Sequence, residues 1–169
     1  MQPGASPVAE VLWRQFGAAI DMLENAIAAC PDDLWSDRSR RPELWYVAYH
    51  TLFLLDLYLS GSPDGFAPPA PFTLDELDDV LPERPYRKDE LLPYLEHGRT
   101  KCRAVIASLT EERLHQAQTW WTHESTMLEM LVYNLRHVQH HAAQLNLLLR
   151  QQTDSAPGWV ARTGRSLDD

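Results

Sequence analysis

The chain has 169 residues, which is enough for one domain with a buried core, and its 44% of hydrophobic and 23% of charged residues are ordinary for a globular protein. Its formal net charge of −9 at pH 7 argues against DNA or RNA as a partner, because nucleic-acid binding needs a basic face. The segments between the proline-rich stretches have helical periodicity and no run of β-branched alternation stands out, so the sequence predicts an all-α fold.

The first predicted helix covers about residues 7–29. Its apolar side chains recur at three- and four-residue steps, at Val8, Leu12, Phe16, Ala19, Leu23 and Ile27. Ser6 is a suitable N-cap and Pro7 a suitable first-turn residue, while Pro31 ends the pattern. Residues 32–42 are rich in Asp, Ser and Arg and are predicted to form a connection.

The second predicted helix covers about residues 43–60 and is apolar almost all round, so we expect it to be buried on most sides. A membrane span needs about 20 apolar residues. This stretch is shorter and contains His50 and Asp56, so no membrane partner is expected. Gly61 and Pro63 stop the helix.

Residues 61–86 form a long, proline-rich crossover between the second and third helices. A short helix is predicted inside it at 74–81, with Thr73 as its cap. A functional lid and a plain connection are both open for this segment. The third predicted helix covers 88–109, with a kink or frayed start at Pro93. Its apolar stripe is Leu91, Leu95, Cys102, Val105, Ile106 and Leu109.

The last long helix is predicted from about Glu124 to Gln151, after a loop over residues 110–123, and Ser125 is its candidate cap. Its core stripe comprises Met127, Met130 or Leu131, Leu135, Val138, Ala142, Leu145 and Leu149. Four long helices make a four-helix bundle, which we expect to span residues 1–152. The polar tail, residues 153–169, is expected to be extended and docked through Trp159.

Two cysteines, Cys30 and Cys102, allow a disulfide but do not imply one. The first residues show no basic segment followed by an apolar core, which a secretory signal would need. We therefore expect two reduced, partly buried thiols in a cytoplasmic protein.

The candidate chemistry lies among the seven histidines. His137 and His141 are four residues apart on the last helix, so their imidazoles project from one face and can reach a single ion. A solvated or merely hydrogen-bonded histidine pair is the plainer interpretation of this spacing.

His50 strengthens the metal hypothesis because it sits in the middle of the apolar second helix. Its neighbours on the helix are Tyr46, Val47, Phe53, Leu54 and Leu57. A buried imidazole without a partner is costly, so His50 either bonds to a backbone carbonyl or hydroxyl, or acts as a third ligand facing the last helix. Three neutral imidazoles suit Zn²⁺, Ni²⁺ or Fe²⁺, and three protein ligands leave an open position, as in catalytic sites.

These two elements together resemble the DinB/YfiT-like superfamily of metal-binding four-helix bundles. The matching segments are Trp45–Leu54, which contains His50, and His137–Leu145. The second is similar to the family signature His-x-x-His-His-x-Gly-Gln, with Ala143 where glycine is usual. The resemblance extends from about Val8 to Trp159 and implies a metal triad of His50, His137 and His141.

The resemblance also implies a reaction class. Some members of the family join a low-molecular-weight thiol, such as bacillithiol or mycothiol, to a small electrophile, and others resemble a mycothiol-dependent maleylpyruvate isomerase. The implied function is that of a metal-dependent transferase in which the ion acts as a Lewis acid, the histidines hold it and the nucleophile is bound to it. The implied partner is a small-molecule substrate, and a homodimer is plausible for such bundles.

Four further residues are candidates for the surroundings of the triad. His140 points about 100° away from His141, and we expect it either to contact the metal ligands from behind or to lie at the surface. Gln144 lies one turn beyond His141 and can hydrogen-bond nearby. Tyr46 and Trp121, like Trp120 and Trp159, are candidates for lining a pocket, although packing is the commonest role of aromatic residues.

Three other functions compete with the transferase. A metal-binding protein without catalysis, acting in stress or in interactions, fits the same residues. A histidine phosphotransfer bundle needs one exposed histidine, whereas here three candidates converge. A ferritin-like di-iron protein needs inward carboxylates and Glu-x-x-His pairs, yet the second helix carries only Asp56 between Glu43 and Asp64.

Overall fold

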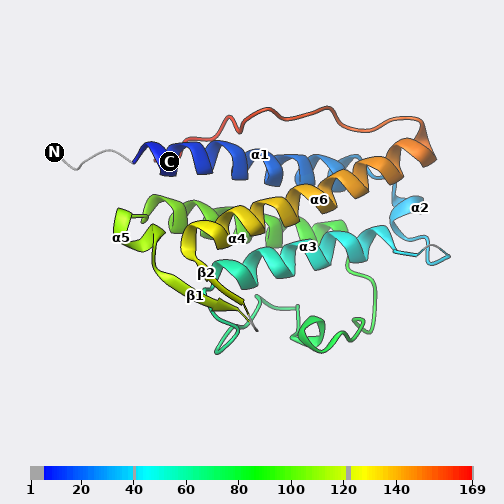
Figure 1. The fold of residues 1–169 in the computed structure, drawn as a ribbon. Helices are drawn as coiled ribbons and strands as arrows, with labels where there is room; N and C mark the ends of the chain where they lie inside the picture. Colours follow the sequence, from blue (N-terminus) through cyan, green and yellow to red (C-terminus); the bar gives the residue numbers. More distant parts are fainter. Residues whose placement is uncertain (1–5, 40, 121–122, 169) are drawn as a thin grey trace.

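The computed structural model describes residues 6–39, 41–120 and 123–168. Its four long helices are α1 (Pro7–Ala29), α3 (Leu44–Leu59), α4 (Lys88–Ala107) and α6 (Met127–Thr153). They form one bundle in which α1 and α3 each pack against both α4 and α6 (Figure 1). The predicted all-α bundle is therefore confirmed. Within the described residues, no helix is long and apolar enough to cross a membrane.

The ends of the first three long helices follow the predicted signals closely. Ser6 caps α1, because its hydroxyl accepts a hydrogen bond from the backbone N–H of Ala9 at 3.2 Å. The buried stripe of α1 begins at Ala9 rather than at Val8, whose side chain is 40% exposed. Val8 points about 100° away from Ala9 and lies outside the buried face, which farther along α1 is broad enough to bury neighbours such as Leu12 and Trp13. Pro93 lies inside α4, which continues unbroken past it.

The two connections around α3 differ from the prediction in opposite ways, because the first has more local structure than expected and the second has less. Residues 32–42 include a short helix, α2 (Asp32–Trp35), whose Trp35 indole donates a hydrogen bond to the carbonyl of Tyr86 at 3.0 Å. In the crossover, the predicted helix at 74–81 is only a 3₁₀ turn, η1 (Asp75–Asp78). Asp79 ends it by adopting a left-handed backbone conformation, with φ of 54°. The crossover lies along one side of the bundle, below α3 in Figure 1.

The segment before the last helix is not the plain loop that was predicted. It holds a short helix, α5 (Glu111–Leu114), and an antiparallel hairpin of β1 (Ala117–Trp120) and β2 (His123–Thr126). The prediction that the last helix starts near Glu124 with Ser125 as its cap is wrong. Those residues pair with β1, and Thr126 caps α6 by accepting a hydrogen bond from the N–H of Glu129 at 3.2 Å.

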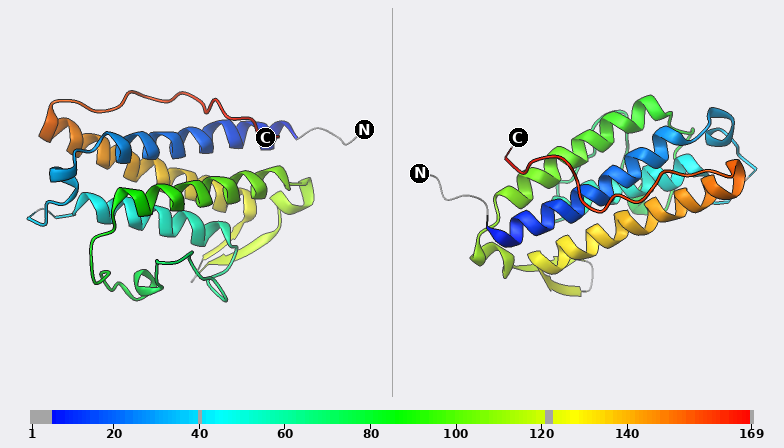
Figure 2. Two further views of the ribbon diagram at one scale, coloured as in Figure 1. Left: turned by 180° about the vertical axis from the view of Figure 1, so that it is seen from behind. Right: turned by 90° about the horizontal axis from the view of Figure 1, so that it is seen from above.

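The C-terminal tail runs back along α1 (Figure 2). The indole N–H of Trp13 donates to the carbonyl of Arg165 at 2.9 Å, and the N–H of Thr163 donates to the carbonyl of Arg14 at 3.0 Å. Thr163 and Leu167 are buried, at 6% and 5% exposure. The expected anchor, Trp159, is 71% exposed, so the tail is held by other residues. The tail docks on α1 because it forms these hydrogen bonds and because a glycine of α1 leaves space for it.

Gly17 of α1 is the point of closest approach to the tail, and it supports a stability prediction. A Cβ at Gly17 would lie 2.6 Å from Thr163 Cγ2 and 2.8 Å from its Cβ, so the tail would have to move. We expect Gly17→Ala to cost about 1–3 kcal/mol of strain, offset by about 1 kcal/mol of helix propensity. Urea denaturation should show a net loss of roughly 1 kcal/mol.

Two further variants control this measurement. Gly158→Ala should leave the unfolding free energy unchanged, because nothing lies within 4 Å of a Cβ at Gly158. Thr163→Gly combined with Gly17→Ala should remove the clash. Equal or higher stability of the Gly17→Ala single variant would show that Thr163 does not dock tightly against α1.

Candidate metal centre

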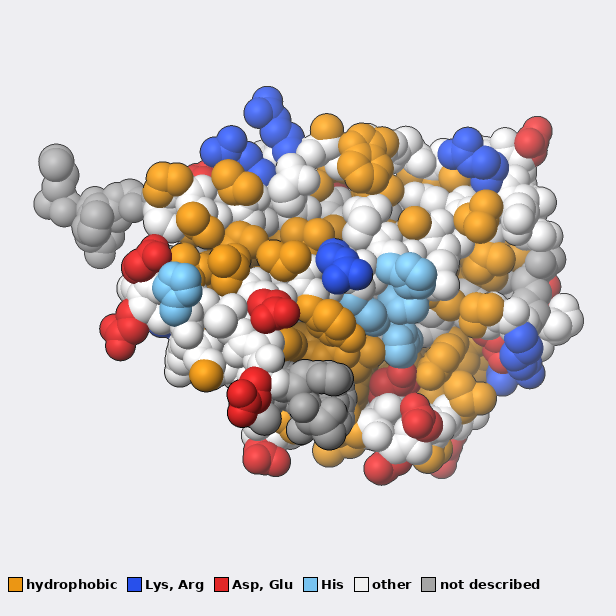
Figure 3. All heavy atoms as spheres, in the orientation of Figure 1, with side chains coloured by type: hydrophobic (Ala, Val, Ile, Leu, Met, Phe, Trp, Pro, Cys, Tyr) orange, Lys and Arg blue, Asp and Glu red, His pale blue; other side chains and the backbone are white. Residues whose placement is uncertain are grey.

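The bundle brings together the three histidines that the sequence singled out. His50 lies in the middle of α3, and His137 and His141 lie one turn apart on α6, which packs against α3. One ligand atom from each of the three lies within 4.8 Å of the other two. The ring centroids are 4.5 Å apart for His137 and His141 and 4.9 Å apart for His50 and His141. Histidine side chains reach the surface on the face of the molecule seen in Figure 3.

The Nδ1 atom of His50 is held by Glu76, a residue of η1 in the crossover. The two atoms Nδ1 and Oε1 are 2.5 Å apart, and the Tyr46 hydroxyl donates to the same carboxylate oxygen at 3.2 Å. Glu76 is 9% exposed, and its other oxygen, Oε2, is buried without a hydrogen-bond partner among the described residues. A carboxylate that accepts the Nδ1 proton leaves His50 Nε2 free to bind a metal.

Gln144 orients His141 as Glu76 orients His50, through a hydrogen-bond acceptor at Nδ1. The amide oxygen of Gln144 lies 2.7 Å from His141 Nδ1, so that nitrogen is the donor and Nε2 carries the lone pair. His137 presents its Nε2 to His50 Nε2 at 3.4 Å, while its Nδ1 is buried with no partner in the described part of the chain. All three histidines can therefore direct Nε2 towards one point.

This arrangement fits a divalent metal ion. With zinc–nitrogen distances of about 2.0–2.1 Å and tetrahedral angles, two ligand nitrogens lie about 3.3 Å apart. The observed 3.4 Å between the Nε2 atoms of His50 and His137 matches that separation. Burial and the neighbouring histidines lower the pKa of His137 to about 3, and burial lowers the pKa of His141. Both imidazoles are thus neutral near pH 7, which is the form that binds metals.

The other residues predicted to surround the triad have different positions relative to it. His140 is exposed and packs edge-on against the His141 ring, with centroids 5.0 Å apart. Tyr46 donates a hydrogen bond to Glu76, and burial of its hydroxyl and the nearby carboxylate raise its pKa to about 12. Trp121 lies outside the described residues.

Sequence reasoning missed Glu76 as a partner of the triad. It is separated from His50 by 26 positions and lies in a proline-rich crossover with no long helical periodicity. The only available signals were the acidic cluster at residues 75–79 and the suggestion that the crossover is functional. Neither of them identifies which carboxylate meets a histidine.

A cavity with a volume of about 830 Å³ lies away from the three histidines, between α3, α4 and the start of the crossover. The buried Asp56 and the partly exposed Lys101 lie in its wall. The Lys101 ammonium donates to the Asp56 carboxylate at 2.5 Å, to the Asp56 carbonyl at 3.0 Å and to Ser60 Oγ at 2.6 Å. Its three protons are all used, so it has none left for a ligand.

Neither cysteine adds a nucleophile to the site. Cys30 and Cys102 are both free and buried. Burial raises the pKa of the Cys30 thiol to about 11 and raises the pKa of the Cys102 thiol as well. Both side chains therefore remain protonated near pH 7 and act as small packing residues.

Comparison with known proteins gives one family. The family model described as the DinB superfamily matches residues 15–145, which is more than half of the chain. The matched segment contains all three clustered histidines and Glu76. No curated protein has a significantly matching sequence.

Proposed function

Because the chain belongs to the DinB superfamily, we propose that it is a divalent-metal-binding protein that joins a low-molecular-weight thiol to a small electrophile. The observation that carries the proposal is the cluster of three histidines with ligand atoms within 4.8 Å of one another. Three protein ligands leave a coordination position for a substrate, which is the pattern of catalytic rather than structural zinc sites. Zn²⁺, Ni²⁺ and Fe²⁺ all suit these ligands.

The residues of the chain would have distinct roles in this reaction. His50, His137 and His141 would hold the ion, and Glu76 and Gln144 would fix the imidazole orientation of His50 and His141. A bound divalent ion lowers the pKa of a thiol and so supplies a nucleophile near neutral pH. The buried charge of Glu76 offsets part of the ion's charge and favours one monoanionic ligand at the open position.

The bond changes in the proposed transfer are simple. The thiol loses its proton to water, and its sulfur forms a C–S bond with the electrophilic carbon. The bond from that carbon to the leaving group breaks at the same time, and the leaving group departs with the electron pair. No oxidant or reductant is needed.

A thiol-transfer screen tests the proposal. Protein loaded with zinc, nickel or iron is incubated with bacillithiol, mycothiol, glutathione or coenzyme A and a panel of electrophiles, and conjugates are measured by mass spectrometry. We expect conjugation with at least one thiol, at least tenfold above the rate without protein. Metal removal should abolish it, because the uncatalysed thiol is mostly protonated at pH 7.

Two other results would contradict parts of the proposal. Turnover that survives removal of the metal would reject the metal-dependent mechanism. A protein that contains metal but transfers no thiol would favour the alternative, a non-catalytic metal-binding protein acting in stress responses or interactions. A cytoplasmic location and a homodimer stay predictions from the sequence.

A further inference from the structure

We infer that the substrate carries an anionic group, such as a carboxylate or phosphate, which Arg136 binds in a groove beside the histidine cluster. The inference rests on the proposed function and names its substrate class. The groove has a volume of about 490 Å³, within the range of roughly 300–1,000 Å³ typical of small-molecule sites. Its lining residues are Tyr133, Leu135, Arg136, His137, Gln139, His140 and Ala143.

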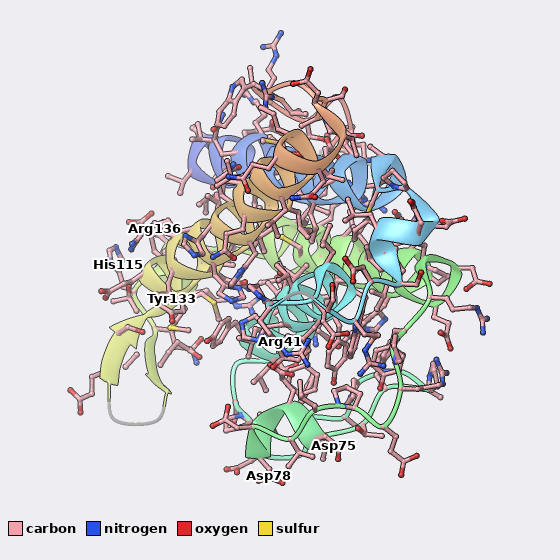
Figure 4. The ribbon with its side chains drawn as sticks, turned by 90° about the vertical axis from the view of Figure 1, so that its right-hand side faces the viewer. Arg41, Asp75, Asp78, His115, Tyr133 and Arg136 are labelled. Carbon is pink, nitrogen blue, oxygen red and sulfur yellow. The ribbon has the colours of Figure 1, made fainter. Side chains whose placement is uncertain are left out.

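The groove is continuous with the candidate metal centre because His137 belongs to both. Arg136 and His140 are four residues apart on α6, so they form a row beside the row of His137 and His141. Tyr133 packs edge-on against Tyr58 at 5.4 Å between centroids, and Tyr58 packs edge-on against His137 at 6.0 Å. Tyr133 and Arg136 extend from the same side of α6, above the β1–β2 hairpin (Figure 4).

The charge in this groove is unusual for the chain. The formal net charge is −9, yet no Asp or Glu lines the groove. Arg136 is exposed and forms no hydrogen bond or ion pair with the described residues. Arg150 on the same helix is likewise unpaired among the described residues, but it lies far from the histidines, so the position of Arg136 beside His137 is what distinguishes it. A basic side chain lies beside the histidines in Figure 3. An unpaired guanidinium offers a planar set of donors that matches a carboxylate or phosphate.

The arrangement favours a small bifunctional molecule. One end would occupy the open position at the three histidines, and an anionic group a few bonds away would reach Arg136, with the His140 imidazole as a second donor. The apolar atoms of Leu135 and Ala143 would contact the linking carbons. Both substrates of a thiol transfer are small enough for this space, so either could carry the anionic group.

A matched pair of thiols tests this inference on zinc-loaded protein. 3-Mercaptopropionate and 3-mercaptopropionamide have the same length and differ in charge. Isothermal titration calorimetry should show about fivefold to tenfold tighter binding of the acid, as for one partly exposed charge-assisted contact. In Arg136→Gln the preference should fall to less than about twofold. Arg150→Gln, on the same helix about 20 Å away, should keep it.

The variants separate recognition by Arg136 from direct binding of the carboxylate to zinc. A preference that survives in Arg136→Gln, or equal affinity of the two thiols in the wild type, overturns the inference. If neither thiol binds, the proposed thiol function fails, and the groove is tested by itself with propionate and propionamide on metal-free protein. The readout is the NMR signal of the Arg136 side-chain N–H. A shift on addition of propionate but not of propionamide supports the anion site, and no shift with propionate rejects it.

Discussion

The double variant His137→Ala/His141→Ala should lose its metal almost completely. Untagged wild-type protein, purified without chelators, is expected to contain about one divalent ion per chain, because neutral imidazoles bind such ions tightly. The variant keeps only His50, and a single imidazole cannot hold the ion through purification. We expect less than about a tenth of an ion per chain by inductively coupled plasma mass spectrometry.

His115→Ala is the matched control for this experiment. His115 is exposed at the end of α5 and pairs only with Glu111 of its own turn, so its loss should leave the metal content unchanged. Unchanged metal content in the double variant would reject the three-histidine site. A wild type without metal would reject it as well, provided that added zinc also fails to bind.

Thermal stability gives a second measure of the same site. A ligand that binds only the folded state at 1,000 times its Kd stabilises it by about 4 kcal/mol. Added zinc should therefore raise the Tm of the wild type and of His115→Ala, and have little effect on the double variant. This result also distinguishes loss of the site from loss of the fold, because the double variant must still unfold cooperatively.

The long helices could be predicted from the sequence because each buries a stripe or a whole face. Val47, Leu55 and Leu57 of α3 are all buried, as its all-round apolar character requires. The hairpin could not be predicted in this way. Its strands have four residues each, they pair with one another rather than with a larger sheet, and Ala117 and Glu124 are exposed. Short exposed strands leave no hydrophobic periodicity.

The candidate site also has a part that the sequence predicts and a part that it does not. The His137 and His141 pair follows from helix geometry, because spacing along a helix fixes which side chains share a face. Glu76 does not, since its position depends on how a crossover with little regular structure folds over α3. The tail is a similar case: Trp159 is its only aromatic residue, yet its docking depends on hydrogen bonds to α1 and on the space at Gly17.

Replacement of Glu76 by glutamine should weaken metal binding about 10–100-fold, the usual effect of losing the carboxylate partner of a metal-binding histidine. The amide keeps an oxygen that can accept the Nδ1 proton of His50, so the orientation of the ring should persist. The negative charge that makes Nε2 a stronger ligand and balances the ion is lost. Competition with a chromogenic chelator measures the Kd for zinc. Asp78→Asn, an exposed change in the same η1 turn, should leave the Kd unchanged.

Comparison with Glu76→Ala separates the charge of Glu76 from its role in holding the crossover. Alanine removes both hydrogen bonds, from His50 and from Tyr46, so it should free η1 as well as weaken the metal site. Hydrogen exchange of the crossover amides should then be faster in Glu76→Ala than in Glu76→Gln. If glutamine binds zinc as tightly as the wild type while alanine does not, the carboxylate acts only as an anchor. If both variants lose affinity equally and exchange at the wild-type rate, its charge carries the whole effect.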